Sequence, residues 1–441
     1  MIATHRLSDG AFESLAAGYG GADTINVLRH AQLSKHLLLI RYIAESWPGD
    51  TSERDDALAV LAAAQRRAPG PVSEFLAGPS IATWATWVAR RLRGSASSAP
   101  LAAEAGHLSA IAAVSALIAG LDASLAAHVR DGLVALPVLG ALTVPLPHGA
   151  RVRIEAASGA LTVTEKGLSV DIRPAGEAES AGWLPLRWLA ASNGELGHSV
   201  AVDDLDPYCG DRYGLPAGRI PDGQFKRWQT LFAHAWDLLT RYVPERADEL
   251  RTGLRAIVPL VAVTAGPELS ATSGDSFGML GASEPGSAVD FAMTMVHEFQ
   301  HSKLNGVLDI VPLYDSTSRR TYFAPWRTDP RPIGALLQGI YAFLGIATVW
   351  ERLRENPDLR HLAERNLAAV RTQVDDALTT LARSEHLTPD GVRFAAGMRS
   401  TLDTLLAVPV PARTEASARD ALRRSHQNWL RRNGRESRSV R

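Results

Sequence analysis

Two histidines and one glutamate stand close together in the run His297-Glu298-Phe299-Gln300-His301. An apolar, helix-favouring segment precedes this run, so the motif is predicted to lie on a helix. Because residues four positions apart share one face of a helix, both imidazoles would be within reach of a single metal ion. Glu298 would lie beside them, where it could take a proton from a metal-bound water or orient a ligand. The alternative is a helix whose histidines are ordinary polar residues of the surface or core.

A metal held by two histidines needs further ligands, and the sequence leaves the third one open. The Glu that long-spacer zincins carry on a second helix has no convincing counterpart before Glu351, and Val307 stands where a metzincin has its third histidine. Asp309 would complete the two-histidine, one-carboxylate set that is usual for non-haem Fe(II) oxygenases. Gln338 is expected on the next helix, where its amide oxygen would be a weak ligand for zinc. The competing interpretations are an ordinary loop carboxylate and a buried amide bonded to its neighbours.

The segment between the two expected helices is rich in aromatic residues, arginine and proline. The eleven residues 322–332 contain three aromatic residues, two arginines and three prolines, which stiffen the backbone. Arg327 and Arg331 could bind a carboxylate through paired hydrogen bonds. Salt bridges with Asp329 or Asp315, which are near in sequence, would be the structural alternative for both arginines.

Composition narrows the classes of function. The chain has 441 residues, of which 46% are hydrophobic, so it can bury a sizeable core in two or three domains. The single cysteine, Cys209, excludes a disulfide within the chain and a thiolate metal cluster. The 46 basic and 47 acidic residues give a net charge of −1, which argues against nucleic-acid binding through bulk charge. The metal ligands must therefore come from His, carboxylate, amide or water.

The N-terminal residues and the longest apolar stretch predict the cellular location of the protein. The first twelve residues are polar and contain no hydrophobic signal segment. The longest uncharged apolar stretch, residues 105–121, is mostly alanine and is interrupted by Gly, His and Ser, so we expect a buried helix rather than a membrane span. These features predict a soluble, cytoplasmic protein that binds neither a membrane nor nucleic acid.

The pattern along the chain predicts an α+β fold that is predominantly helical. We expect a helical N-terminal region over 1–131, with helical periodicity running to residue 129. Period-two alternation predicts an antiparallel β-meander over 133–202, within a β region and loop covering 132–223. A helical catalytic region follows over 224–411, with a buried strand expected at 257–263. A basic tail, 412–441, is expected to be solvated or frayed. We expect one continuous unit in which the motif helix packs beside the helix of Gln338.

Several blocks of sequence resemble the HExxH-motif proteins of ribosomal peptide natural-product clusters. The specific part of the resemblance lies within 297–343, and looser similarity extends from residue 7 to residue 433. The blocks that carry the resemblance most specifically are His297-Glu-Phe-Gln-His-Ser-Lys-Leu, Leu308-Asp, Ala324-Pro-Trp-Arg-Thr-Asp-Pro-Arg-Pro and Leu336-Leu-Gln-Gly-Ile-Tyr-Ala-Phe.

This resemblance implies an Fe(II)- and 2-oxoglutarate-dependent oxygenase that hydroxylates the β-carbon of a side chain in a precursor peptide. His297 and His301 would hold the iron, and Glu298 would support the ligands rather than act as a hydrolytic base. Arg331 or Arg327 would bind the distal carboxylate of 2-oxoglutarate. Some members of the family are fused to radical-SAM enzymes, so such an enzyme is an expected partner beside the precursor peptide.

Two other functions remain open at this point. A zinc peptidase would use the same histidines and would activate a zinc-bound water with Glu298. A non-catalytic peptide-binding protein would use the Gly/Ser-rich segment 266–287, in which residues 277–280 could form an edge strand that pairs with an extended peptide.

Overall fold

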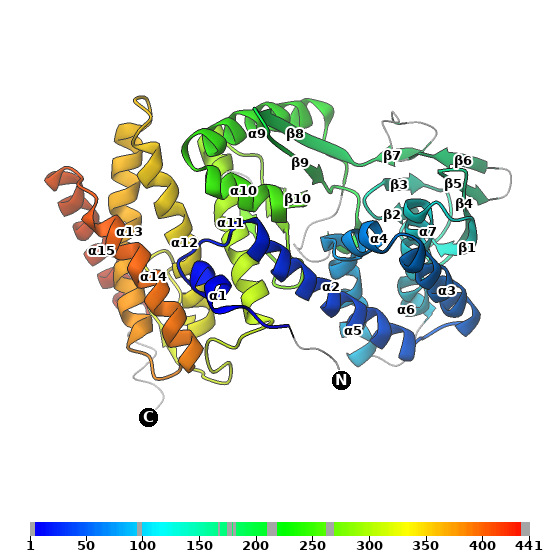
Figure 1. Ribbon diagram of the computed structural model, residues 1–441, viewed down its shortest axis with the longest axis horizontal. Coiled ribbons are helices and arrows are strands. Elements are labelled where there is room, and N and C mark those ends of the chain that lie inside the picture. Colours follow the sequence, from blue (N-terminus) through cyan, green and yellow to red (C-terminus); the bar gives the residue numbers. More distant parts are fainter. Residues whose placement is uncertain are drawn as a thin grey trace.

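The computed structural model describes residues 5–94, 99–165, 168–173, 179, 182–209, 218–261 and 269–433. Helices make up 58% of the structure and strands 16%, which confirms the predominantly helical α+β class. Figure 1 shows helices gathered toward both ends of the sequence and the strands between them. Residues 262–263, the end of the strand expected at 257–263, and residues 434–441 of the basic tail lie outside the described residues.

Helices precede the first strand, as predicted. They are α1 (Asp9–Ala16), α2 (Gly21–Glu45), α3 (Thr51–Arg67), α4 (Pro69–Leu76), α5 (Pro79–Gly94), α6 (Ala99–Ala105) and α7 (Leu108–Ala119). Ser8 and Asp50 cap α1 and α3 by accepting hydrogen bonds from backbone N–H groups of the first turn. The prediction that the helical pattern runs to residue 129 is wrong after α7. Gly120 ends that helix with a φ of +63°, and the strand β1 (Ala123–His128) follows.

The expected meander is divided among separate sheets, so the single antiparallel meander is wrong. One sheet has the order β1, β4 (Arg151–Ala157), β5 (Ala160–Glu165) and β6 (Leu168–Ile172), and all its pairs are antiparallel. A second sheet contains β2 (Leu133–Leu136), β3 (Gly140–Thr143) and β7 (Trp183–Pro185). Alternating residues predicted most of these strands correctly, but alternation does not encode which strands pair.

A third, five-stranded sheet lies between the two halves of the chain. Its order is β11 (Ser270–Ala271), β12 (Met279–Ala282), β10 (Ala256–Pro259), β9 (Leu196–Val202) and β8 (Arg187–Asn193). The strand β10 is parallel to both neighbours, β9 and β12, so this sheet is mixed. The edge strand expected at residues 277–280 is also wrong, because β12 is paired on both sides and all four of its residues are buried.

The C-terminal part is helical, and the expected tail is largely a helix. Its elements are α9 (Asp222–Tyr242), α10 (Pro244–Gly253), α11 (Ala288–Leu308), β13 (Thr321–Tyr322), β14 (Arg331–Pro332), α12 (Ile333–Leu353), α13 (Arg360–Ala382), α14 (Pro389–Ala407) and α15 (Ala412–Asn433). The prediction of a frayed tail is therefore wrong as far as residue 433. The helix α15 lies against α13 at one end of the molecule (Figure 1).

Two buried apolar clusters hold the fold together. The large core unites α1 and the start of α2 with β8, β9, β10, β12 and the helices from α9 to α14. The small core contains the end of α2, the helices α3 to α7 and the strands β1 to β7. The helix α2 belongs to both, since Ile25 and Leu28 enter the large core and Ile40 and Ile43 enter the small one. The two cores therefore do not follow the boundaries of the regions expected from the sequence.

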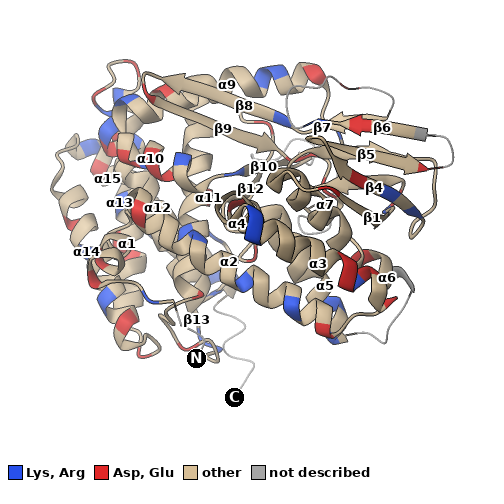
Figure 2. Cartoon of the chain, turned by 45° about the vertical axis from the view of Figure 1, so that its right-hand side comes forward, with Lys and Arg blue, Asp and Glu red and all other residues tan. Residues whose placement is uncertain are grey.

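The most apolar segments of the chain are buried, and the charged residues are mixed over the surface. Two helical segments, Leu101–Ala119 and Ile333–Leu353, are long and apolar enough to cross a membrane, but 89% and 78% of their most apolar 18-residue stretches are buried inside the fold. Figure 2 shows basic and acidic residues interspersed over the elements in view. That distribution matches the nearly balanced composition of the chain.

Candidate metal centre

The motif lies on α11, as its sequence predicts. Ser287 caps the helix by accepting a hydrogen bond from the backbone N–H of Asp290. Phe291, Met295 and Phe299 follow at intervals of four and are buried in the large core. That anchored stripe fixes the rotation of the helix and turns the two motif histidines toward α12, which packs alongside α11 as expected.

The two histidines converge on one point. The Nε2 atoms of His297 and His301 lie 3.2 Å apart. Two nitrogens at this separation can both bind one ion at a distance of about 2.1 Å, with an angle of roughly 100° between the two bonds. Imidazole suits zinc, iron, copper and nickel alike. The pair can therefore supply two of the ligands of a transition metal.

Gln338 acts on His301 rather than toward the convergence point. The Nδ1–H of His301 donates to Oε1 of Gln338 at 2.9 Å, and Nε2 of Gln338 donates to Oδ1 of Asn305 at 2.7 Å. Protonation of Nδ1 leaves the Nε2 lone pair of His301 free for a metal. Metal-binding histidines in proteins are oriented by such hydrogen bonds to their second nitrogen. The position of Gln338 thus favours an orienting role over the ligand role considered from the sequence.

The neutral form of His297 is favoured by its surroundings. Desolvation of the ring, together with the neighbouring His301, lowers the pKa of His297 to about 3. The ring of Phe343 packs edge-on against it with centroids 5.0 Å apart, and the ring of Trp326 lies tilted against Phe343 with centroids 4.7 Å apart. A metal binds the neutral imidazole, so this apolar cover keeps His297 in its binding-competent state.

A cavity of about 410 Å³ opens beside the histidines. One wall comes from α12, on which residues at helical spacing turn Ala335, Gln338, Gly339 and Phe343 into the cavity. The rest of the lining comes from the arginine-rich segment, namely Trp326, Arg327 and Arg331, and Trp326 packs against Phe343 of α12. This volume lies within the usual range of small-molecule sites.

The two arginines bring positive charge to this cavity. Arg327 Nε lies 3.1 Å from one oxygen of Asp329, and Arg331 Nη1 lies 3.0 Å from the other. The Arg331 guanidinium lowers the pKa of the Asp329 carboxyl, which is therefore ionised at neutral pH. Two guanidinium groups share one carboxylate, so the wall keeps an excess of one positive charge. The salt bridges anticipated with Asp329 exist, and they leave this wall attractive to an anion.

The C-terminal helix α15 holds the arginine-rich segment from outside. Phe323 stacks on His426 with ring centroids 4.6 Å apart and meets Trp429 edge-on at 5.6 Å. Asn433 Nδ2 donates to the backbone oxygen of Thr328 at 2.9 Å. A helix that the sequence did not predict therefore positions the segment that carries both arginines.

Asp309 does not reach the histidines, so its role as a ligand is not supported. It is the C-cap residue of α11, eight positions after His301, which corresponds to about 12 Å along a helix. Its carboxylate pairs with Lys35 Nζ at 2.8 Å and accepts a hydrogen bond from Gln32 Nε2 at 2.9 Å. These two residues lie on α2, so Asp309 joins two helices instead of binding a metal.

Glu298 also faces away from the cavity, which is lined without it. Its side chain is buried, with only 3% exposed, and each carboxylate oxygen accepts one hydroxyl hydrogen bond. Ser270 Oγ and Thr272 Oγ1 donate these bonds, both at 2.6 Å. The carboxylate thus attaches the segment of β11 to the motif helix. A base that activates water would have to face the metal, so this arrangement does not support that role.

The structure contains a buried ionic cluster near the motif that the sequence analysis did not predict. Glu249 on α10 pairs with Lys303 at 2.9 Å and with Arg246 at 3.1 Å, and all three side chains are at most 2% exposed. Lys303, Arg246 and Gln300 also donate to the backbone oxygen of Gly18. The sequence contained one indication of this cluster: Lys303 is one of only four lysines in the chain and stands two positions after the motif.

A third strong ligand is missing from the cavity within the residues that the structure describes. Among them, the group of three or more His, Cys, Asp or Glu side chains close enough to hold one ion is Asp203, Asp206 and Cys209, elsewhere in the fold. Burial and the neighbouring Asp206 raise the pKa of Asp203 to about 8. A metal between His297 and His301 would therefore take its remaining ligands from a bound small molecule or from water.

Comparison with known proteins does not indicate a function, so the function must be inferred from the site. No protein-family model matches the chain, and no curated protein matches it.

Proposed function

We propose that the protein is an Fe(II)- and 2-oxoglutarate-dependent oxygenase that hydroxylates a side chain of a ribosomally made peptide at its β-carbon. The observation that carries the proposal is the pair of Nε2 atoms 3.2 Å apart at a cavity that Arg327 and Arg331 also line. The resemblance of residues 297–343 to peptide-modifying HExxH proteins supports the same reaction and the peptide substrate.

The donor set fits this cofactor better than it fits a metal held by protein alone. His297 and His301 would hold the iron, and 2-oxoglutarate supplies a keto oxygen and a carboxylate oxygen, which are ligands that iron accepts. With these two oxygens, the iron would not need a carboxylate of the protein. The missing third protein ligand is therefore compatible with the proposed co-substrate.

Arg331 would bind the distal carboxylate of 2-oxoglutarate. It is the more enclosed arginine of the cavity wall, with 33% of its side chain exposed against 55% for Arg327. A guanidinium recognises a carboxylate through two parallel hydrogen bonds, and partial burial strengthens them. Asp329 competes for both arginines, so its position sets how strongly the wall attracts the anion.

When bound, the iron and 2-oxoglutarate supply the oxidising chemistry: 2-oxoglutarate, O₂ and the peptide C–H group become succinate, CO₂ and a C–OH group. The chain contributes binding and orientation. Gln338 holds the tautomer of His301 through its Nδ1–H, and Phe343 keeps water from one face of His297. Trp326 closes the wall beside Phe343, which limits access to the centre.

A zinc peptidase is the less supported alternative because of Glu298. A peptidase needs this carboxylate at the metal-bound water, whereas both of its oxygens are hydrogen-bonded to Ser270 and Thr272. The peptide-binding alternative through an edge strand at residues 277–280 loses its basis, since β12 is an inner strand.

The test begins without the peptide. Fe(II) and 2-oxoglutarate are added to the protein without oxygen, and we expect the visible charge-transfer band of 2-oxoglutarate chelated to Fe(II). The variant His297→Ala should lack the band, and Arg331→Met should need a higher concentration of 2-oxoglutarate. Addition of oxygen should then give succinate. Stoichiometric zinc, cleavage of added peptides and no band would refute the proposal and favour the peptidase.

A further inference from the structure

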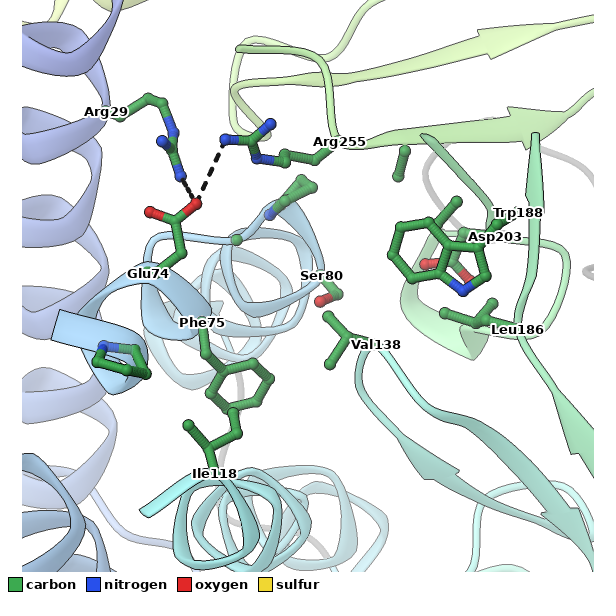
Figure 3. Close-up of a pocket in the computed structure, with 15 residues that line it drawn as sticks. Arg29, Glu74, Phe75, Ser80, Ile118, Val138, Leu186, Trp188, Asp203 and Arg255 are labelled. Carbon is green, nitrogen blue, oxygen red and sulfur yellow. Dashed lines mark hydrogen bonds and ion pairs between the residues drawn. The ribbon is translucent and has the colours of Figure 1, made fainter. Parts of the chain in front are cut away.

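A second hollow lies at the junction of the small core and the five-stranded sheet. It has a volume of about 240 Å³ and is bordered by α2, α4, α5, α7 and the strands β8, β9 and β10. Figure 3 shows Phe75 and Ile118 on one side of the open space and Leu186 and Trp188 on another. The lining of this hollow shares no residue with the cavity beside His297 and His301, so the two sites are separate.

The rim of this hollow has more positive than negative charge. Arg29 and Arg255 both pair with Oε1 of Glu74, and the second pair measures 3.3 Å (Figure 3). One carboxylate thus neutralises one of two guanidinium groups. The Arg29 side chain is 14% exposed and that of Arg255 33%, so both are shielded from part of the solvent that would screen them. This arrangement attracts one further anionic group.

The walls of the hollow are mostly apolar, and two of the hydrophobic side chains that form them are exposed to solvent. Val138 is 38% exposed and Trp188 is 44% exposed, and both are among the few large hydrophobic side chains at the described surface. Val138 also has a φ of +64°, which a β-branched residue adopts only at a steric cost. Exposed apolar side chains around a concavity are typical of a binding site.

Asp203, which also borders the hollow, does not oppose an anion. Its carboxyl is buried beside Asp206. Burial and the repulsion between the two carboxyls raise the pKa of Asp203 to about 8, so it is mostly protonated at neutral pH. Ser80, which also borders the hollow, adds an uncharged polar group.

We infer that this hollow binds a small organic acid with an aliphatic or aromatic body. The carboxylate would pair with Arg255 and Arg29 in competition with Glu74, and the body would lie between Phe75 and Trp188. The small volume suits one compact molecule rather than a folded partner, and the apolar walls disfavour inorganic phosphate. This site goes beyond the proposed oxygenase function and does not depend on it.

The experiment uses octanoate as the probe and the full-length protein. Isothermal titration should give a submillimolar dissociation constant, as expected for a ligand of about ten non-hydrogen atoms. Octylammonium, which has the same chain and the opposite charge, should not bind. Octanoate should also bind equally well with EDTA present, because the metal centre is not involved.

Variants of the rim should change the affinity in opposite directions. Arg255→Met should weaken octanoate binding about tenfold, which is the usual loss for one charge-assisted hydrogen-bonded pair. Glu74→Gln removes the competing carboxylate and should tighten binding several-fold. Arg241→Met, an exposed arginine on α9 that pairs with Asp237, is the matched control and should leave the affinity unchanged.

Several outcomes would overturn the inference. The inference is wrong if neither octanoate nor 4-phenylbutyrate binds to the wild-type protein, or if octylammonium binds as tightly as octanoate. An unchanged affinity in both Arg255→Met and Glu74→Gln would also contradict it. If only a peptide ending in a free phenylalanine carboxylate binds, the occupant is a peptide terminus and the assignment to a small acid is wrong. Because Glu74 is largely exposed, its variant should fold even if Arg255→Met does not.

Discussion

Replacing Gln338 by leucine tests the arrangement of the candidate metal centre most directly. Leucine has nearly the volume of glutamine, so the packing between α11 and α12 should remain. The substitution removes the acceptor for the Nδ1–H of His301 and the donor to Asn305. The substitution leaves the Nε2 atoms of His297 and His301 in place and removes only the hydrogen bond that orients the His301 ring.

The size of the effect follows from the hydrogen bond that is lost. A metal on Nε2 would polarise the ring, so the 2.9 Å bond from Nδ1 to Gln338 becomes charge-assisted. Such bonds contribute about 1.5–3 kcal/mol, which corresponds to roughly 10- to 150-fold in a dissociation constant. Removal of orienting partners at other metal sites changes affinity by about 10- to 100-fold. We therefore expect Gln338→Leu to bind metal about 10- to 100-fold more weakly.

The assay is a titration with Co(II), whose visible spectrum reports its ligands. The wild-type protein should bind one equivalent, and His297→Ala should bind none at the same concentration. Asn305→Ala is the matched control, since it removes only the outer bond at 2.7 Å and should weaken binding less than Gln338→Leu does. Gln338→Glu should bind at least as tightly as wild type, because a carboxylate is a stronger acceptor for Nδ1–H.

Two results would refute this reasoning at different levels. If Gln338→Leu binds Co(II) as tightly as the wild-type protein while His297→Ala does not bind, the amide does not orient the ligand. If the wild-type protein and His297→Ala behave alike, the pair of histidines is not a metal site. Circular dichroism of each variant separates loss of binding from loss of the fold.

Four further predictions concern other parts of the molecule. Asp329→Asn should lower the KM for 2-oxoglutarate by about fivefold, because it releases both arginines; a higher KM in turnover assays would contradict this. Glu298→Gln should retain most 2-oxoglutarate turnover, whereas loss of a general base would reduce turnover by about 10²- to 10⁴-fold. Gly339→Ala should lower the free energy of unfolding by about 1–3 kcal/mol in thermal denaturation, since its Cβ would lie 2.4 Å from the ring of Trp326; an unchanged stability would mean that the ring moves freely. Desolvation lowers the pKa of His198 to about 3, so the unfolded chain binds an extra proton below pH 6.5 and stability falls as the pH decreases. Between pH 7 and pH 5, His198→Phe should therefore lose about 2 kcal/mol less than the wild-type protein in urea denaturation, and equal losses would contradict the assignment.

The sequence predicted the class of the fold and most of its elements, but not how the strands combine. Alternation identified β4, β5 and β6 because each exposes one face. Alternation is local, and it could not show that β8 and β9 leave the other strands to join β10 and β12. That pairing depends on Leu189, Val200 and Val202 packing against Trp228, Phe232 and other residues of the large core. Helical periodicity failed after Ala119, since an alanine-rich strand resembles a helix in composition.

The candidate site was predicted in part for the same physical reasons. Spacing along one helix brought His297 and His301 together, and the order of helices placed Gln338 opposite them. Sequence could not decide between Gln338 and Asp309, because the partner of Asp309 is Lys35, 274 positions away. The direction of Glu298 likewise depends on Ser270 and Thr272, which reach α11 only through the third sheet. Local sequence patterns therefore could not predict these contacts between segments that are distant in the sequence.

The unequal origin of the two cores sets the order in which a growing chain can complete them. The small core draws on residues from 40 to 208, so most of its contacts can form during synthesis of the first half of the chain. The large core joins α1 to α14, where Phe12 meets Phe394 with ring centroids 5.7 Å apart. Residues 9–16 must therefore wait for almost 400 further residues before they are covered. During that interval the apolar residues of α1 and of the start of α2 that belong to the large core stay exposed, so this segment is prone to aggregate until the C-terminal helices have been made.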